Sequence, residues 1–89
     1  MNKDEILKIT NEVFCDVFDD EDIVINFETT ADDIEDWDSL EHINLVLAIE
    51  DRFKIKFTMG EVTGMKNVGA MIDIISERTP LWWNIDITN

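Results

Sequence analysis

The sequence has one cysteine, one histidine, one proline and no long apolar run. A single thiol, Cys15, cannot form a disulfide within the chain, and its helix-like surroundings indicate an ordinary helix residue. No apolar segment approaches the roughly 18 residues that a membrane-spanning helix needs. The amino terminus, MNKDEILKIT, is polar and amphipathic and lacks the apolar core of a signal peptide. We therefore expect a cytoplasmic protein that does not associate with membranes.

Basic residues are also scarce, and they are missing from nearly half of the chain. Lys and Arg number 7 against 21 Asp and Glu, which gives a formal net charge of −14. Between Ile9 and Asp51 there are 15 acidic residues and no Lys or Arg. This charge excludes a nucleic-acid partner, because binding to phosphate depends largely on basic contacts. We expect protein partners with basic patches, with solubility as the alternative purpose of the acidic residues.

The size and the apolar pattern predict one small helical domain. The 89 residues are 45% apolar and 31% charged, a balance typical of a globular protein with one core. A first helix is expected over about residues 3–17, because apolar residues recur at steps of three or four. These residues are Ile6, Ile9, Val13 and Val17, with Leu7 and Phe14 alongside.

The segment FDDEDIVINFETTADDIEDW, residues 18–37, interrupts the helical pattern. Its DIVIN portion has strand character but no evident partner strand. We expect a long acidic connection, and a connection of this length in a small domain is typically functional or held by apolar anchors. The expected anchors are Ile23, Ile25, Phe27, Ile34 and Trp37.

Three more helices are expected after this connection. The second runs from about Ser39 to Arg52, and its predicted main apolar stripe comprises Leu40, Ile43, Leu47 and Phe53, broadened by Val46 and Ile49. The segment TMGEVTG predicts a short third helix limited by Gly60 and Gly64. Asn67 is a good N-cap for a fourth helix over about residues 68–77. Its expected inward residues are Val68, Met71, Ile72 and Ile75.

The fold class that follows is an all-α, four-helix bundle with a long first loop. We expect the domain to occupy residues 1–79 and a C-terminal extension to occupy residues 80–89, after the stop signal Pro80. The extension contains the adjacent tryptophans Trp82 and Trp83. This tryptophan pair could fold back on the core, contact a partner or remain free in solution.

The stretch EDWDSLEH raises the question of whether Ser39 is only a helix-start residue. If Asp38 is the N-cap, Glu41 occupies the third helical position of an acidic capping box. Ser39 is then the first helical residue, with its hydroxyl free. Unpaired N–H groups and the helix dipole favour a phosphate at such an end. The residues alone leave both interpretations open: a phosphoester-bearing serine and a plain helix-start serine.

The stretch lacks the residues that catalysis or calcium binding would need. A serine nucleophile needs a general base and an oxyanion hole. The only histidine, His42, has no clear orienting acid, so we interpret it as a surface residue and expect no enzymatic activity. An EF-hand loop beginning at Asp36 would place Leu40 and Leu47 where calcium needs oxygen ligands, and Glu41 where the turn needs glycine. We therefore predict no metal site.

The segment DSLEHINLVLAIEDRFKIKF resembles the phosphopantetheine-attachment region of acyl carrier proteins, and the similarity continues without an evident gap to about Ile75. In that family a D-S-L tripeptide opens the second helix, and its serine receives 4′-phosphopantetheine as a phosphodiester from a separate transferase. The matching residues are Asp38, Ser39, Leu40, Ile43, Val46, Leu47, Ile49, Glu50, Asp51 and Phe53, followed at family core and cavity positions by Ile55, Phe57, Val62, Met65 and Val68. The resemblance implies covalent attachment at Ser39, flanked by Asp38 and Leu40.

The resemblance also implies a carrier rather than an enzyme. The thiol at the end of the arm would hold an acyl or aminoacyl group as a thioester for the enzymes of fatty-acid, polyketide or nonribosomal-peptide biosynthesis. Implied partners are a phosphopantetheinyl transferase and acyl-handling enzymes with basic patches, which a monomer would meet through Asp38, Glu41, Glu50 and Asp51. Residues implied to contact the arm or its cargo are Leu40, Phe57, Val62, Met65 and Val68. The alternative is a non-carrier acidic adaptor of the same fold.

Several residues depart from the pattern of family members that serve fatty-acid synthesis. Those members usually have glycine and a small residue before D-S-L, where this chain has Asp36 and Trp37. Asn44 stands at a family acidic position, and His42 adds partial positive charge. The W-D-S-L motif resembles specialised, stand-alone carriers of aminoacyl, polyketide, peptide or surface-glycan pathways.

Overall fold

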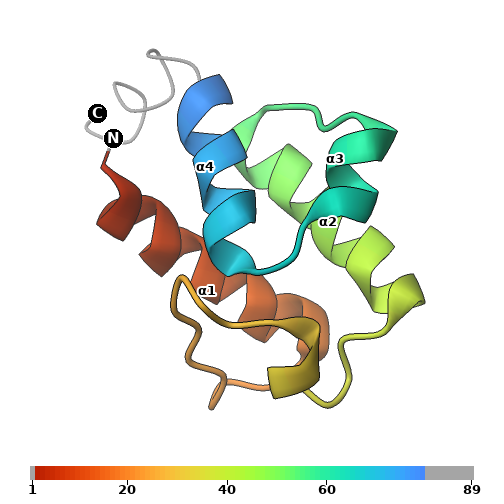
Figure 1. Ribbon diagram of the computed structural model, residues 1–89. Coiled ribbons are helices and arrows are strands. Elements are labelled where there is room, and N and C mark those ends of the chain that lie inside the picture. Colours follow the sequence, from red (N-terminus) through yellow and green to blue (C-terminus); the bar gives the residue numbers. More distant parts are fainter. Residues whose placement is uncertain (1, 80–89) are drawn as a thin grey trace.

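The structure, a computed structural model, describes residues 2–79 and is shown in Figure 1. Its helices are α1 (Lys3–Phe18), α2 (Ser39–Phe53), α3 (Met59–Gly64) and α4 (Val68–Arg78), with a 3-10 turn, η1, at Ala31–Asp33. Residues 2–79 contain no strand, so the DIVIN segment belongs to the first loop. The all-α prediction is confirmed. The Trp82–Trp83 pair and the predicted extension lie outside the described residues.

Each α-helix begins at a polar side chain that caps its first turn. Asn2, Asp38, Thr58 and Asn67 each accept a hydrogen bond from the backbone N–H three residues further along. Such caps satisfy N–H groups that have no partner inside the helix. The predicted Asn67 cap is confirmed. Within residues 2–79, no helix has the length and apolar character needed to cross a membrane.

The core lies where α1 packs against α2 and α4, while α3 lies on the side of the bundle away from α1 (Figure 1). All four predicted inward residues of α4 are fully buried, which confirms that part of the pattern. The largest fully buried side chains are Phe14, Phe53, Ile6, Leu45, Ile49, Met71, Ile72 and Ile75. Burial of this apolar surface is the main favourable contribution to folding.

The structure corrects the predicted orientation of α2. Three predicted core residues face solvent: Leu40 is 69% exposed, Ile43 is 43% exposed and Leu47 is 57% exposed. The buried stripe comprises Leu45, Val46, Ile49 and Phe53. Burial of Val46, Ile49 and Phe53 confirms that part of the prediction, whereas Leu45 was not predicted. The helix carries apolar residues on two neighbouring stripes, so its periodicity fits either orientation. Packing against α1 selects one stripe and leaves the other in solvent beside Ser39.

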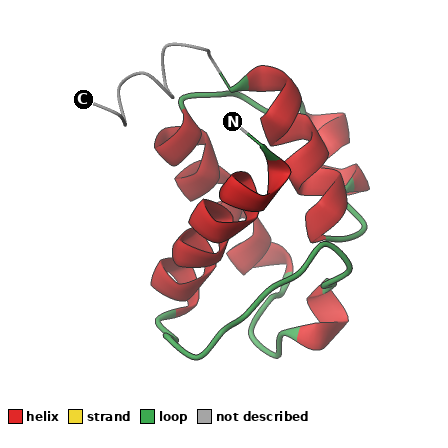
Figure 2. Ribbon diagram, turned by 90° about the vertical axis from the view of Figure 1, so that its left-hand side faces the viewer, coloured by secondary structure: helices red, strands yellow, loops and turns green. Residues whose placement is uncertain are grey.

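The first loop runs along one end of the bundle, as Figures 1 and 2 show. The Asn11 side chain of α1 donates to the Ile23 carbonyl at 3.0 Å and accepts from the Ile25 N–H at 2.7 Å. Ile25 and Trp37 are buried, as predicted for anchors. Phe27 is 36% exposed, so the prediction of its ring as an anchor is wrong. Its carbonyl attaches the loop instead, because it accepts the Gly69 N–H of α4 at 2.7 Å.

Thr10 is a buried polar residue of α1 whose hydroxyl has no hydrogen-bond partner within the described part of the chain. A buried hydroxyl without a partner lowers stability. We predict that Thr10→Val, which exchanges the hydroxyl for a methyl group, raises the free energy of unfolding by about 1 kcal/mol. Urea unfolding measures this change, with Thr63→Val on the exposed face of α3 as the control. A less stable Thr10→Val protein would contradict the prediction.

Candidate functional site

Ser39 is the first residue of α2, and its side chain is exposed. Asp38 is the N-cap, as predicted: its carboxylate accepts the Glu41 N–H at 2.8 Å and its carbonyl accepts the His42 N–H at 2.9 Å. The reciprocal half of the expected capping box is missing, because the Glu41 carboxylate accepts from the Asn44 side chain at 3.3 Å. Within residues 2–79, the Ser39 hydroxyl makes no hydrogen bond, so it is available for modification.

The start of α2 suits a phosphodiester. The first N–H groups of a helix have no partner inside it, and the helix dipole is positive there. Asp38 takes up the N–H of Glu41, whereas the N–H groups of Ser39 and Leu40 donate to no group in the described residues. A phosphate on the Ser39 hydroxyl would therefore lie beside two available donors.

A groove of about 370 Å³ opens beside Ser39 and is called the Ser39 groove below. Three segments contribute to it: the end of the first loop, the first turn of α2 and the connection between α3 and α4. Its lining includes Trp37, Ser39, His42, Met65 and Lys66. The lining thus combines an aromatic residue, a methionine and a basic residue in a region that is otherwise strongly acidic.

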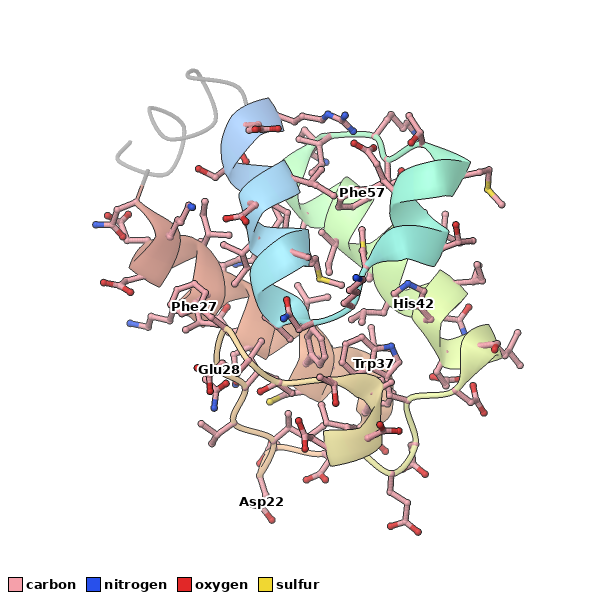
Figure 3. All side chains as sticks on the ribbon, viewed as in Figure 1. Asp22, Phe27, Glu28, Trp37, His42 and Phe57 are labelled. Carbon is pink, nitrogen blue, oxygen red and sulfur yellow. The ribbon has the colours of Figure 1, made fainter. Side chains whose placement is uncertain are left out.

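Trp37 and His42 form a hydrogen-bonded pair at this groove (Figure 3). Trp37 Nε1 lies 3.1 Å from His42 Nδ1, and His42 Nε2 lies 2.9 Å from the Val62 carbonyl oxygen. Because the indole N–H can only donate, Nδ1 accepts, and the neutral ring donates its Nε2 proton to Val62. The Trp37 ring also packs edge-on against Phe14 of α1, with centroids 5.1 Å apart. The Trp37–His42 pair therefore joins the first loop, α2 and α3.

This arrangement corrects the interpretation of His42 as a surface residue. Its ring is half-buried, and both of its nitrogens are engaged. It also gives Trp37 a role that the sequence did not reveal. The only sign of this contact in the sequence is that Trp37, a hydrogen-bond donor, precedes the start of α2 and that His42 follows it by five residues. The contact to Val62 could not be predicted, because it depends on how α3 packs on α2.

The residues predicted to contact the arm or its cargo do not all lie at the Ser39 groove. Met65 lines it. Leu40 is exposed on the outward face of α2, and Val62 and Val68 are buried. Phe57 is half-buried and lies well away from the Trp37–His42 pair (Figure 3). Contact between these residues and an arm stays a prediction.

The acidic residues predicted for partner docking differ in their surroundings. Asp38 is the N-cap that precedes Ser39, and Glu41 lies in the first turn of α2. Asp51 is exposed and 3.8 Å from the Lys54 ammonium group. The Glu50 carboxylate accepts the Phe57 N–H at 2.7 Å and so attaches the segment after α2 to the helix. Glu50 therefore has a structural role in addition to any role in docking.

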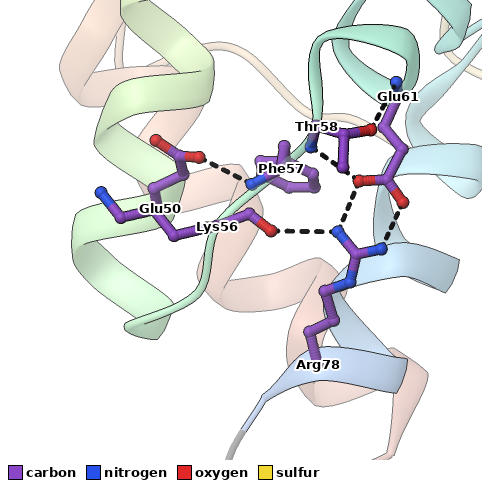
Figure 4. A network of polar contacts seen from close by, with 6 residues as sticks. All are labelled: Glu50, Lys56, Phe57, Thr58, Glu61 and Arg78. Carbon is purple, nitrogen blue, oxygen red and sulfur yellow. Dashed lines mark hydrogen bonds and ion pairs between the residues drawn. The ribbon is translucent and has the colours of Figure 1, made fainter.

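A polar network connects α3 and α4 (Figure 4). Arg78 donates to both carboxylate oxygens of Glu61 and, at 3.0 Å, to the Lys56 carbonyl. The Thr58 N–H donates to the same carboxylate at 2.8 Å. The hydrogen bond from Arg78 and then that from the Thr58 backbone lower the pKa of Glu61 from 4.5 to about 2. Folding therefore favours the charged carboxylate.

This network predicts a loss of stability in acid. Because the pKa of Glu61 is lowered in the folded protein, its contribution is fully present above about pH 4.5 and is lost as the pH falls toward about 2. We predict that Glu61→Gln lowers the melting temperature at pH 7. The difference in melting temperature between this variant and the wild type should become smaller as the pH falls. Thermal unfolding from pH 7 to pH 2 measures this, with the exposed Glu28→Gln as control. A difference that does not change with pH would contradict the prediction.

Comparisons with known proteins extend over most of the chain. No protein-family model matches it. It is 33% identical over 79 residues to the acyl carrier protein of Petrotoga mobilis. The aligned residues make up 88% of this chain and 92% of that protein. It is also similar to the solution NMR structure of holo acyl carrier protein from Geobacter metallireducens, with a TM-score of 0.77 and 44% identity. That match covers 81% of this chain and 83% of the other.

Proposed function

Because the chain belongs to the acyl carrier protein family, we propose that Ser39 is the serine that bears its 4′-phosphopantetheine arm. Members of this family are carriers rather than enzymes, and the thiol of the bound arm holds an acyl group as a thioester. The observation that carries the assignment is the Ser39 hydroxyl: it is exposed at the first position of α2, and no hydrogen bond occupies it within residues 2–79. The only other serine in the sequence is Ser76, which is half-buried in α4.

The surroundings of Ser39 support this role through position and charge. The Asp38 cap holds the first turn of α2 without using the serine hydroxyl. The N–H groups at the start of the helix and the positive charge of Lys66, a residue that lines the Ser39 groove, favour an anionic phosphodiester. These groups offset part of the repulsion from neighbouring carboxylates.

A phosphopantetheinyl transferase and acyl-handling enzymes are partners of this family, and for this chain we propose the outward face of α2 as their docking surface. The exposed stripe of Leu40, Ile43 and Leu47 begins beside Ser39. An apolar centre with a charged rim is typical of protein interfaces. The proposed acidic rim comprises Asp38, Glu41, Glu50 and Asp51. These carboxylates would steer partners with basic patches toward the apolar stripe.

The attachment site can be tested by locating the arm on tryptic peptides. Incubation with coenzyme A and a broad-specificity phosphopantetheinyl transferase should add the mass of one arm. Because Lys and Arg are absent between Ile9 and Asp51, trypsin releases Ser39 in one peptide, residues 9–52, and Ser76 in another, residues 67–78. We expect the arm on the first peptide, with fragmentation placing it at Ser39. An arm on any other residue would overturn the assignment.

We propose that this carrier serves a specialised biosynthetic pathway rather than general fatty-acid synthesis. The support comes from Trp37, a large residue just before the D-S-L tripeptide, and from the contact it makes with His42. Both residues line the Ser39 groove. They therefore alter the surroundings of the proposed attachment site.

A further inference from the structure

The Trp37–His42 pair lines the Ser39 groove beside the proposed attachment site, and its indole ring packs on Phe14 of the core. We propose that this pair closes the gap between α2 and α3 beside Ser39, and so adapts the carrier to short, polar cargo rather than long alkyl chains. The inference rests on the proposed attachment at Ser39, because that attachment sets where the arm begins.

The hydrogen bonds of the pair join the first loop, α2 and α3 within one helical turn of Ser39. His42 lies one helical turn after Ser39, and its Nε2 reaches the Val62 carbonyl of α3 at 2.9 Å. Any group that enters between α2 and α3 at this point must break that hydrogen bond. The Val62 carbonyl would then lose its partner, which is unfavourable for a group that stays out of water.

Trp37 holds the histidine ring from the other side. Its indole N–H donates to His42 at 3.1 Å, and its ring is only 8% exposed because it packs on Phe14. Moving the indole away would expose a large apolar ring and leave a void next to Phe14. The histidine ring therefore cannot turn aside without disturbing the core.

The interior behind the pair is already filled. The next turn of α2 after His42 places Leu45 and Val46 against the core, and both are buried. Protein interiors are close-packed, and inserting further methylene groups forces neighbouring side chains out of position. A long alkyl chain would thus gain little burial in this protein and would leave apolar surface in water.

The Ser39 groove offers a different environment, suited to polar cargo. It is open to water and is lined by Lys66 and Asp38, which carry opposite charges, as well as by the Met65 side chain. A short acyl group with a charged or hydrogen-bonding substituent, such as an aminoacyl group, is well solvated outside the bundle and gains nothing from an apolar cavity. Such cargo does not need the gap between α2 and α3.

The test compares two cargoes on the same protein. Stable amide analogues of coenzyme A bearing a glycyl or an octanoyl group are loaded by the broad-specificity transferase, and intact mass verifies each product. For the wild type we expect both loaded forms to melt within about 2 °C of the form that bears the arm alone. With the octanoyl group, the NMR signals of the Trp37 indole N–H and the His42 ring should stay where they are in the form that bears the arm alone. An octanoyl group that raises the melting temperature by about 5 °C or more, or that shifts those signals, would overturn the proposal.

Two variants separate gap closure from a general effect on stability. In His42→Ala the hydrogen bond to Val62 is lost and the space of the imidazole ring is vacated. An octanoyl group can occupy that space without displacing Leu45 or Val46, so it should raise the melting temperature by about 5 °C over the same variant with the arm alone. His42→Gln can still donate to Val62 and accept from Trp37, so it should behave like the wild type. Each variant is compared with its own arm-bearing form, so a lower starting stability does not affect the result. An octanoyl group without effect on His42→Ala would overturn the proposal.

The outcomes also distinguish this inference from the assignment of Ser39. If no mass is added, or if it is added elsewhere, the attachment at Ser39 fails and the cargo inference fails with it. If the arm is found on Ser39 and the octanoyl group stabilises the wild type, only the cargo inference fails.

Discussion

Ser39→Ala is expected to abolish attachment of the arm while leaving the fold intact. The Ser39 side chain is exposed and makes no hydrogen bond in the described structure, so its removal breaks no internal contact. Alanine is a strong helix former, and the Asp38 cap remains in place. We therefore expect the free energy of unfolding to change by less than about 0.5 kcal/mol. The protein should fold but carry nothing.

Intact mass after incubation with coenzyme A and the transferase measures the loss, and urea unfolding verifies the fold. Ser76→Ala is the matched control, because it removes the only other serine hydroxyl and leaves the start of α2 unchanged. That variant should gain one arm, like the wild type. An arm on Ser39→Ala would show that another residue is the acceptor.

Gly69→Ala should lower the free energy of unfolding by about 2 kcal/mol, the scale of overpacking in a close-packed region. A Cβ at position 69 would lie 2.8 Å from the Phe27 carbonyl oxygen, a backbone atom that cannot move alone. The same carbonyl accepts the Gly69 N–H at 2.7 Å, and the next N–H toward the amino terminus, that of Val68, donates to Thr29 at 2.9 Å. To relieve the clash between the new Cβ and the Phe27 carbonyl, the first loop would have to move away from the start of α4 and weaken both hydrogen bonds.

Gly60→Ala is the matched control for this prediction. No atom lies within 4 Å of a Cβ built at Gly60, which is an α3 residue. There the better helix propensity of alanine should raise the free energy of unfolding by up to about 1 kcal/mol. Urea unfolding followed by circular dichroism compares the two variants. Equal stability of Gly69→Ala and Gly60→Ala would contradict the close approach of the loop to α4.

The position of the first loop matters for the site because the loop ends at Trp37 and Asp38. Contacts with Asn11 and Gly69 hold its earlier part, and the Trp37–His42 pair holds its end. We infer that these contacts together set where the cap and the Ser39 groove lie. The proposed attachment site is thus positioned by residues distant from it in the sequence.

Features that depend on neighbouring residues could be predicted from the sequence. The bounds of α1, α2 and α4 agree with the structure to within about two residues, because helix periodicity and caps are local properties. Asp38 as the cap of α2 follows from the same local rules. The exposed position of Ser39 follows from that cap.

The sequence by itself therefore determined the helices, the Asp38 and Asn67 caps and the available hydroxyl at the start of α2, since these depend on groups within one or two helical turns. Only the tertiary structure decided which apolar stripe of α2 is buried, because both stripes satisfy the helical period. It also decided that His42 bonds to Val62 and that Glu50 bonds to Phe57. Those contacts join separate elements, so they arise from the packing of the whole chain and have no local pattern.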